Sequence, residues 1–237
     1  MANFTTRLKS REEVADGTYA FRFEKPEGFE FKAGQFLTWS LIDPPETDAE
    51  GTRRFFSIAS ACYEDHLMFT TRIRDTAFKR IVKAMPEGAE IAINGPLGKL
   101  TLPEDESRPV VFLVGGIGIT PFRSMALEAT RTRPDQQIFL FYSNRRVTEA
   151  AFFDELRELE KINPRYRFIG TFSAADQSWQ GERGRIDREM LARYIPDLSA
   201  PIYYVAGPTG MTDELRSMLE EVGISRDDVR SEKFTGY

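Results

Sequence analysis

The chain has 237 residues, of which 41% are hydrophobic and 29% are charged, and its formal net charge is −5. This length suits one large domain or two of ordinary size, and the acidic balance argues against a nucleic-acid-binding protein. With one cysteine and one histidine, Cys62 and His66, the chain has too few ligands for a zinc site or a four-cysteine iron–sulfur cluster. We therefore expect no metal.

Membrane and export signals are not found in the sequence. No apolar run approaches the roughly 20 residues that are needed to cross a bilayer. The first five residues also lack the apolar core of a signal peptide. We expect a cytoplasmic protein that is not bound to a membrane.

Residues 1–103 carry short runs rich in β-branched and aromatic residues, separated by glycine and proline. The runs are residues 18–23, 35–42, 55–59, 67–73 and 90–93. This pattern predicts antiparallel strands in a sandwich or barrel. One helix is expected at residues 76–84, where Phe78, Ile81 and Val82 share a face.

Residues 108–237 instead alternate between strand and helix patterns. Strands are expected at residues 109–114, 137–142, 166–172 and 202–206, and helices at residues 121–130, around 152–159, and from Thr212 to a stop at Gly223. Such alternation predicts a doubly wound parallel sheet. We therefore expect two domains, residues 1–103 and 108–237, joined by the polar stretch 103–108.

A glycine-rich turn follows the first of these C-terminal strands. Gly115, Gly116 and Gly118 come directly after an apolar run, and Pro121 marks the start of a helix. Glycines let the backbone approach a pyrophosphate, and a helix N-terminus offers free N–H groups. The spacing departs from the usual Gly-x-Gly-x-x-Gly pattern. Nucleotide binding is the favoured interpretation, and a tight strand-to-helix turn is the alternative.

Two further segments carry a weaker signal. Residues 71–83 hold five basic side chains against one acidic side chain, which fits either an anionic ligand or a solvated basic face. Residues 205–211 form a second strand that ends in glycines before a helix. Ligands of open α/β sheets bind beyond the carboxyl ends of the strands, so both glycine turns could line one crevice; two structural turns are the alternative.

Taken together, these motifs resemble the ferredoxin–NADP⁺ reductase superfamily over nearly the whole chain. The family's flavin motif, Arg-x-Tyr-Ser or Arg-x-Tyr-Thr, is similar to Arg54, Phe56 and Ser57, and Gly34-Gln35-Phe36 resembles the turn that precedes it. Residues 115–121 and 207–211 resemble its two nucleotide loops. The resemblance implies a flavin-binding β-barrel followed by an NADP-binding α/β domain, without a fused ferredoxin domain.

The resemblance also implies roles for individual residues. Ser57, Thr120 and Tyr237 would lie at the hydride-transfer centre, with Ser57 near flavin N5 and Thr120 near the nicotinamide. The flavin-binding residues would be Arg54, Phe55, Phe56, Ser57, Arg72, Ile73, Arg74, Ala77, Phe78, Lys79, Phe234 and Tyr237. The nicotinamide nucleotide would be bound by Gly116, Gly118, Thr120, Pro121, Gly207, Pro208 and Met211.

The chain departs from the family pattern at three places. Phe56 replaces the usual tyrosine, which removes a hydroxyl contact and leaves ring packing. The segment after Arg72 lacks the usual glycine and serine or threonine, although its positive charge and helix start remain. Ala206 stands where many relatives carry a cysteine near the hydride path, so this chain has no thiol there.

The loop after the second C-terminal strand predicts a preference for NADPH over NADH. Ser143, Asn144, Arg145 and Arg146 follow that strand, where an NAD-binding sheet often places an acid for the ribose 2′-hydroxyl. Arginine suits the 2′-phosphate of NADP, and Arg185 could reach the same phosphate. Exposed arginines without a ligand are the alternative.

The last residues, 231–237, end on an aromatic side chain. Tyr237 is expected to lie over the flavin as a displaceable lid, with Gly236 easing its movement. Phe234 is the competing candidate for the flavin contact. Glu232 could be a further hydrogen-bond partner. The plain alternative is a frayed terminus with Phe234 packed on the domain surface.

The resemblance implies an enzyme that moves a hydride from NADPH to bound FAD. Electrons would then pass to a ferredoxin, a flavodoxin or an oxygenase component. Two alternatives remain open: an electron-transfer subunit of a larger enzyme, and a nucleotide-binding regulatory protein that has lost turnover.

Overall fold

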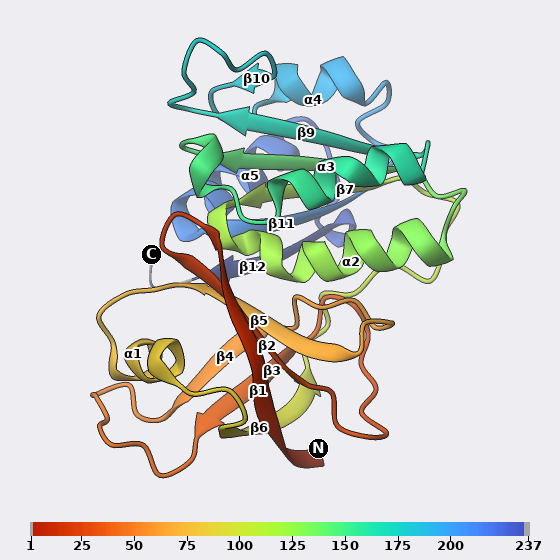
Figure 1. Cartoon of the computed structure of the whole chain (residues 1–237). Helices are drawn as coiled ribbons and strands as arrows, with labels where there is room; N and C mark the ends of the chain where they lie inside the picture. The colour runs from red at the N-terminus through yellow and green to blue at the C-terminus, as the bar shows by residue number, and fades with distance from the viewer. Residues whose placement is uncertain (1, 235–237) are drawn as a thin grey trace.

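The computed structural model describes residues 2–234, which form two sheets, one in each half of the chain (Figure 1). The N-terminal sheet has six antiparallel strands in the order β4-β3-β6-β1-β2-β5. Its elements are β1 (Ala2–Ala15), β2 (Thr18–Glu24), β3 (Phe36–Leu41), β4 (Arg53–Ser57), β5 (His66–Arg72), α1 (Ala77–Ala84) and β6 (Glu90–Leu97). The sheet curls until its edges meet, since the Ala59 amide just after β4 donates to the Met68 carbonyl of β5 at 2.7 Å. The predicted antiparallel barrel is confirmed.

Aromatic side chains fill the barrel. Phe69 lies at the centre, with its ring centroid 5.0 Å from that of Phe21 and 4.8 Å from that of Trp39. Helix α1 buries Phe78 and Val82 against this cluster. Thr76 caps the helix by accepting from the Lys79 amide at 3.4 Å. The core therefore holds α1 with its N-terminus beside β4 and β5.

The C-terminal sheet has six parallel strands in the order β10-β9-β8-β7-β11-β12. Its elements are β7 (Val110–Gly115), α2 (Ile119–Thr132), β8 (Ile138–Asn144), α3 (Phe153–Ile162), β9 (Tyr166–Phe172), β10 (Glu182–Arg183), α4 (Arg188–Tyr194), β11 (Ile202–Pro208), α5 (Thr209–Glu221) and β12 (Val229–Phe234). The predicted doubly wound sheet is confirmed.

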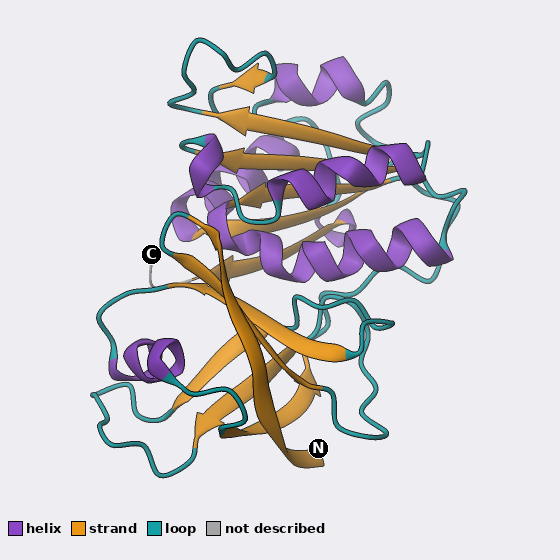
Figure 2. Ribbon diagram, viewed as in Figure 1, coloured by secondary structure: helices purple, strands orange, loops and turns teal. Residues whose placement is uncertain are grey.

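Helices cover both faces of this sheet, whereas α1 is the one helix in the described part of the barrel (Figure 2). Every residue of β7 is buried. Phe112 points to the face covered by α2 and α3, and Leu113 points to the face covered by α4 and α5. Burial on both faces explains why this strand is a continuous apolar run.

The two halves share part of one core. Barrel residues Ala20, Ala59 and Met68 pack in the same cluster as Phe122 and Met125 of α2. The Ser124 hydroxyl of α2 also donates to the Ser60 carbonyl at 2.7 Å. Strand β12 is the strand of the C-terminal sheet that lies next to the barrel (Figure 1). The carboxyl ends of the parallel strands are thereby held against β4 and β5.

Several elements differ from the expectation. Strands β1, β10 and β12 and helix α4 are not among the predicted elements. Charged side chains interrupt the apolar pattern of β1, α4 and β12, and β10 has only two residues. Helices α2 and α5 begin two and three residues earlier than Pro121 and Thr212. The frayed-terminus alternative is wrong for residues up to Phe234, which pair in parallel with β11. Residues 235–237 lie outside the described part, and so does the Tyr237 lid.

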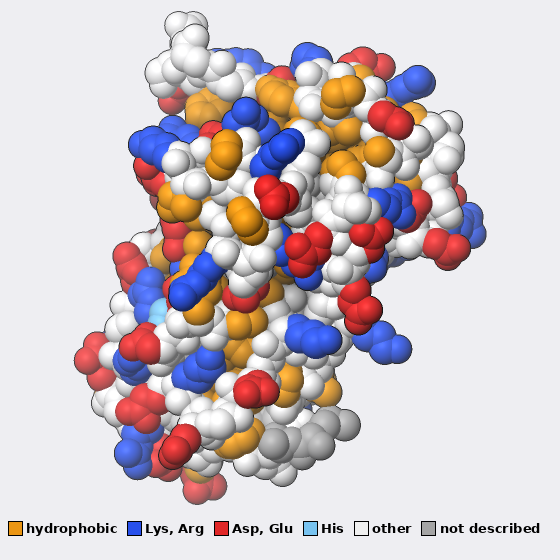
Figure 3. Space-filling model, turned by 90° about the vertical axis from the view of Figure 1, so that its right-hand side faces the viewer, with side chains coloured by type: hydrophobic (Ala, Val, Ile, Leu, Met, Phe, Trp, Pro, Cys, Tyr) orange, Lys and Arg blue, Asp and Glu red, His pale blue; other side chains and the backbone are white. Residues whose placement is uncertain are grey.

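The surface carries both signs of charge. On the face drawn in Figure 3, Lys and Arg side chains are interspersed with Asp and Glu. Within residues 2–234, no helix has the length and apolar character needed to cross a membrane. No group of three or more potential metal ligands occurs among the same residues.

Candidate active site

Three adjoining cavities lie between the barrel and the carboxyl ends of the parallel strands. The sheet cavity, of about 610 Å³, is bordered by the ends of β7, β8 and β11. The interdomain cavity, of about 110 Å³, lies between β4, β5 and the start of α2. The barrel cavity, of about 820 Å³, is lined by β4, α1 and β12. Arg72 borders the first two, and Ser57 and Phe234 border the last two, so the three are contiguous.

The interdomain cavity brings together the two catalytic candidates of the described chain. Ser57 comes from the end of β4 and Thr120 from the first turn of α2, and both line it. Thr120 is anchored by donating its hydroxyl to the Ile117 carbonyl at 3.2 Å. The phenyl ring of Phe234, from β12, borders the same cavity.

Ser57 is buried without a hydrogen-bond partner among the described residues. Its side chain is 3% exposed, and its Oγ has no donor or acceptor within reach. Thr70 Oγ1, on the wall of the same cavity, is in the same state. Buried polar atoms are nearly always paired, and an unpaired one costs about 1–3 kcal/mol. A polar ligand in this cavity would satisfy both hydroxyls.

Aromatic rings form the apolar wall beside Ser57. The ring of Phe56 stacks on Phe69 with a centroid separation of 4.5 Å and an interplanar angle of 7°. Phe55, on the opposite face of β4, is 65% exposed. The replacement of tyrosine by Phe56 therefore preserves ring packing, and the two phenylalanines border the interdomain and barrel cavities.

The basic candidates line overlapping parts of the three cavities. Arg54, Arg74 and Lys79 line the barrel cavity together. Burial, reinforced by the charge of Arg74, lowers the pKa of Lys79, whose Nζ donates to a backbone carbonyl at 2.9 Å. Arg72 instead borders the sheet and interdomain cavities and pairs with Glu149 at 3.6 Å. Arg72 therefore borders the nucleotide loops on one side and shares the interdomain cavity with Arg74 and Lys79 on the other.

Three predicted flavin residues do not line these cavities with their side chains. Ile73 packs against the barrel core, and Ala77 and Phe78 are buried in α1. Ala77 instead presents its backbone amide at the N-terminus of α1, and this amide donates to Asp48 Oδ2 at 2.8 Å. Asp48 was missed by the sequence reasoning, although an acidic run precedes Arg54.

Close packing explains why glycine is needed at position 118 of the first nucleotide loop. A Cβ on Gly118 would lie 2.7 Å from the Ala206 carbonyl group, so only glycine lets the start of α2 meet the end of β11. Gly116, with φ of +54°, lines the sheet cavity with Pro208 and Met211. Gly118, Pro121 and Gly207 are not among the residues that line that cavity.

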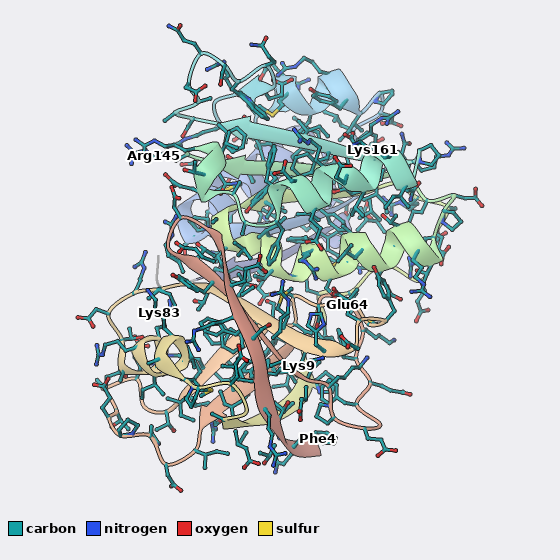
Figure 4. All side chains as sticks on the ribbon, in the orientation of Figure 1. Phe4, Lys9, Glu64, Lys83, Arg145 and Lys161 are labelled. Carbon is teal, nitrogen blue, oxygen red and sulfur yellow. The ribbon has the colours of Figure 1, made fainter. Side chains whose placement is uncertain are left out.

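The candidates for nucleotide preference gather in the sheet cavity. Ser143, Asn144 and Arg145 follow β8, and Arg185 faces them from the loop after β10. Figure 4 shows Arg145 projecting outward from the end of β8. Asn144 Nδ2 is buried without a partner among the described residues. Arg185 binds the Glu214 carboxylate at 2.9 and 3.2 Å, a contact that the sequence did not indicate.

The two β12 residues considered for the flavin both face the barrel cavity. Glu232 and Phe234 line it together with Ser57. Burial raises the pKa of the Glu232 carboxyl. Tyr237, the third candidate from this segment, lies outside the described residues.

Comparison with known proteins finds similar sequences among oxidoreductases. Residues 112–217 match the family model for the oxidoreductase NAD-binding domain. The chain is 26% identical to the glycine betaine monooxygenase reductase subunit of Chromohalobacter salexigens, over 92% of this chain and 60% of that one. It is 27% identical to ferredoxin–NADP reductase B of Sorangium cellulosum, over 98% and 97% of the two chains.

A solved structure agrees with the fold. The ferredoxin–NADP⁺ reductase of Neisseria gonorrhoeae with bound FAD and NADP superposes with a TM-score of 0.81 at 21% identity, covering 98% of both chains. The fold is thus that of a two-domain protein whose parallel sheet matches an oxidoreductase NAD-binding domain. The chain is similar to ferredoxin–NADP⁺ reductase-like oxidoreductases. It spans about 60% of the length of the monooxygenase reductase subunit.

Proposed function

We propose that this chain binds FAD in the barrel cavity and NADPH in the sheet cavity, and transfers a hydride from one to the other. Flavin binding is assigned to residues 1–103 and nucleotide binding to residues 108–237. The observation that carries the proposal is the meeting of Ser57 and Thr120 from different domains in one narrow cavity. The unpaired, buried Ser57 Oγ supports a polar ligand at that point.

The residues present fit a flavin. The phenylalanine wall suits an aromatic ring system, Ser57 and Thr70 offer unsatisfied hydroxyls at its edge, and Arg74 and Lys79 suit its phosphates. A bound flavin would supply the hydride acceptor and pass single electrons onward. The protein would contribute position, exclusion of water and electrostatics.

Each domain would hold one reactant in place. The Ser57 hydroxyl would hydrogen-bond the flavin edge, and Thr120 would orient the nicotinamide. The glycine loop after β7 would let the nucleotide diphosphate approach the first turn of α2. Because the interdomain cavity measures only about 110 Å³, a ligand ring that enters it would leave little room for water.

The spectrum of the purified protein tests this function. A flavin-loaded protein is yellow, and NADPH should bleach its visible bands under anaerobic conditions. The apoprotein should take up added FAD and quench its fluorescence. A protein that takes up no flavin would contradict the proposal and favour a regulatory nucleotide-binding role.

The electron acceptor is proposed as a ferredoxin or an oxygenase component. The Sorangium relative is named a ferredoxin reductase and matches over 97% of its length. The Chromohalobacter relative is named a monooxygenase reductase subunit and extends beyond the matched region. NADPH-dependent reduction of ferredoxin or flavodoxin by this chain alone would favour a diffusible reductase. Reduction only of a cognate oxygenase component would favour an electron-transfer subunit.

A further inference from the structure

An acidic loop of this chain reaches the phosphate-binding elements of the proposed flavin site. Asp48 lies in the loop that joins β3 to β4. Its Oδ2 accepts from the Ala77 amide at 2.8 Å, and its Oδ1 accepts from Arg54 Nη2 at 3.2 Å. Oδ1 also accepts from the Glu50 amide at 3.0 Å. One carboxylate thus engages both the N-terminus of α1 and a guanidinium.

These donors are the kind that recognise phosphate. A helix N-terminus carries partial positive charge and free amides, and arginine presents a fork of donors to oxyanions. The Ala77 amide is the first in α1, and Arg54 stacks over Phe78, with its guanidinium carbon 5.4 Å from the ring centroid. Asp48 therefore holds the position and charge of a small anion. The Ala77 amide, followed by that of Glu50 and by Arg54, lowers the pKa of the Asp48 carboxyl, so it is ionised at neutral pH.

Arg54 is further occupied by the same loop. Its Nη2 lies 2.9 Å from the Glu50 carboxylate. Its Nη1 donates to the carbonyls of Glu50, Gly51 and Arg53 at 3.0, 2.9 and 2.8 Å. The Arg54 side chain is only 13% exposed. A ligand phosphate would reach this guanidinium by displacing carboxylates.

Two neighbouring cations, unlike Arg54, are not paired with carboxylates in the described chain. Arg74 and Lys79 line the same barrel cavity, and neither has a carboxylate partner within residues 2–234. Ser57 on the same wall is an independent sign of a ligand, because the residue is 3% exposed and its hydroxyl has no partner among those residues. The cavity therefore has cations available to an anionic ligand, beside a pair of donors already filled by Asp48.

We propose that Asp48 sets the flavin affinity of this chain by competing with the flavin phosphate for the Ala77 amide and Arg54. This inference rests on the proposed function. The competition weakens the binding of FMN and FAD, which carry phosphate, and leaves riboflavin, which has none, unaffected. The chain therefore holds its flavin less tightly than Arg54, Arg74 and Lys79 alone would allow.

Flavin titration of the apoprotein tests the proposal without measuring turnover. Fluorescence quenching gives dissociation constants for FAD, FMN and riboflavin in the wild type and in Asp48→Asn, which keeps an acceptor for the Ala77 amide and removes the charge. We expect FAD and FMN to bind about tenfold more tightly to the variant, the size of one charge-assisted hydrogen bond. Riboflavin should bind equally to both proteins.

Two further variants complete the design. Glu46→Gln removes a charge from the same loop, but Glu46 pairs with Arg80 at 2.6 Å, and neither residue borders the barrel cavity. It should leave all three constants unchanged. Glu50→Gln removes the second carboxylate from Arg54 and should tighten FAD and FMN binding by a smaller factor.

The outcomes separate the two proposals. Unchanged or weaker FAD and FMN binding in both Asp48→Asn and Glu50→Gln, with thermal melting like the wild type, would overturn the competition. Equal tightening in Glu46→Gln would also overturn it, because general loop charge would then explain the effect. Failure of every variant, including Asp48→Asn, to bind any flavin would overturn the proposed function instead.

Discussion

Arg123 of α2 and Glu64 of the barrel form a bidentate ion pair across the domain boundary. Nη1 lies 2.9 Å from Oε2, and Nη2 lies 3.1 Å from Oε1. The Arg123 side chain is 5% exposed. Its Nη2 also donates to the Glu155 carboxylate at 2.6 Å, and its Nη1 to the Ala59 carbonyl at 2.7 Å. This arginine therefore fixes the position of α2, and hence of Thr120, relative to the barrel.

Replacing Arg123 by Met should destabilise the protein strongly. Removing one partner of a buried pair leaves uncompensated charge, which costs roughly 3–5 kcal/mol. Denaturant unfolding measures the change. The matched control is Arg157→Met, whose exposed partner Asp154 lies one turn away and whose loss should cost less than about 1 kcal/mol. Equal effects of the two substitutions would show that the buried Arg123 pairing contributes no more to stability than the exposed Arg157 pair.

The Ser57→Ala variant should show whether the Ser57 hydroxyl binds the ligand or stabilises the fold. In the apoprotein the hydroxyl has no partner among the described residues, so its removal should not lower the free energy of unfolding. In the flavin-loaded protein it should slow flavin reduction by NADPH about tenfold or more, the loss of one hydrogen bond in the transition state. Stopped-flow reduction and apoprotein unfolding measure the two effects. A destabilised apoprotein with normal reduction would contradict this role.

Nucleotide preference should depend on Arg145 and Arg185. If each guanidinium binds the 2′-phosphate, Arg145→Ala and Arg185→Ala should raise the KM for NADPH about tenfold or more and leave that for NADH nearly unchanged. Arg146→Ala is the control, since Arg146 does not border the sheet cavity. Steady-state kinetics with both nucleotides provide the measurement. Equal or better catalytic efficiency of the wild type with NADH would show that the NADPH assignment is wrong.

The Glu232 carboxyl should make stability depend on pH. Burial raises its folded-state pKa, so the folded protein binds this proton more tightly than the unfolded chain does. Its stabilising contribution is complete below the unfolded pKa of about 4.3 and is lost as pH rises through the higher folded pKa. Glu232→Gln should therefore make the apoprotein more stable than the wild type at neutral pH. The difference should vanish below pH of about 4. Unfolding curves across this range would contradict the assignment if the two proteins differed equally at every pH.

Much of the fold could be predicted from local patterns. The run from Val110 to Gly115 has no polar residue because both faces of β7 are buried. The glycines at its end and just after it mark the turn into α2. Strands β1 and β12 escaped prediction because alternate side chains face solvent and carry charge. Their strand conformation comes from hydrogen bonds to partners distant in sequence. Pairing of that kind leaves little trace in local composition.

The sequence by itself determined the two-domain order, the glycine turns and the basic segment, because these depend on residues that are neighbours along the chain. Only the tertiary structure decided how the candidates are grouped. It brought Ser57 and Thr120 to one cavity, set Arg72 on the border of the sheet and interdomain cavities and placed Asp48 on Arg54. These outcomes depend on strand register, on the docking of α2 against the barrel and on which carboxylate reaches a given cation. Such contacts join residues far apart in sequence, so their geometry is set by packing and electrostatics in three dimensions.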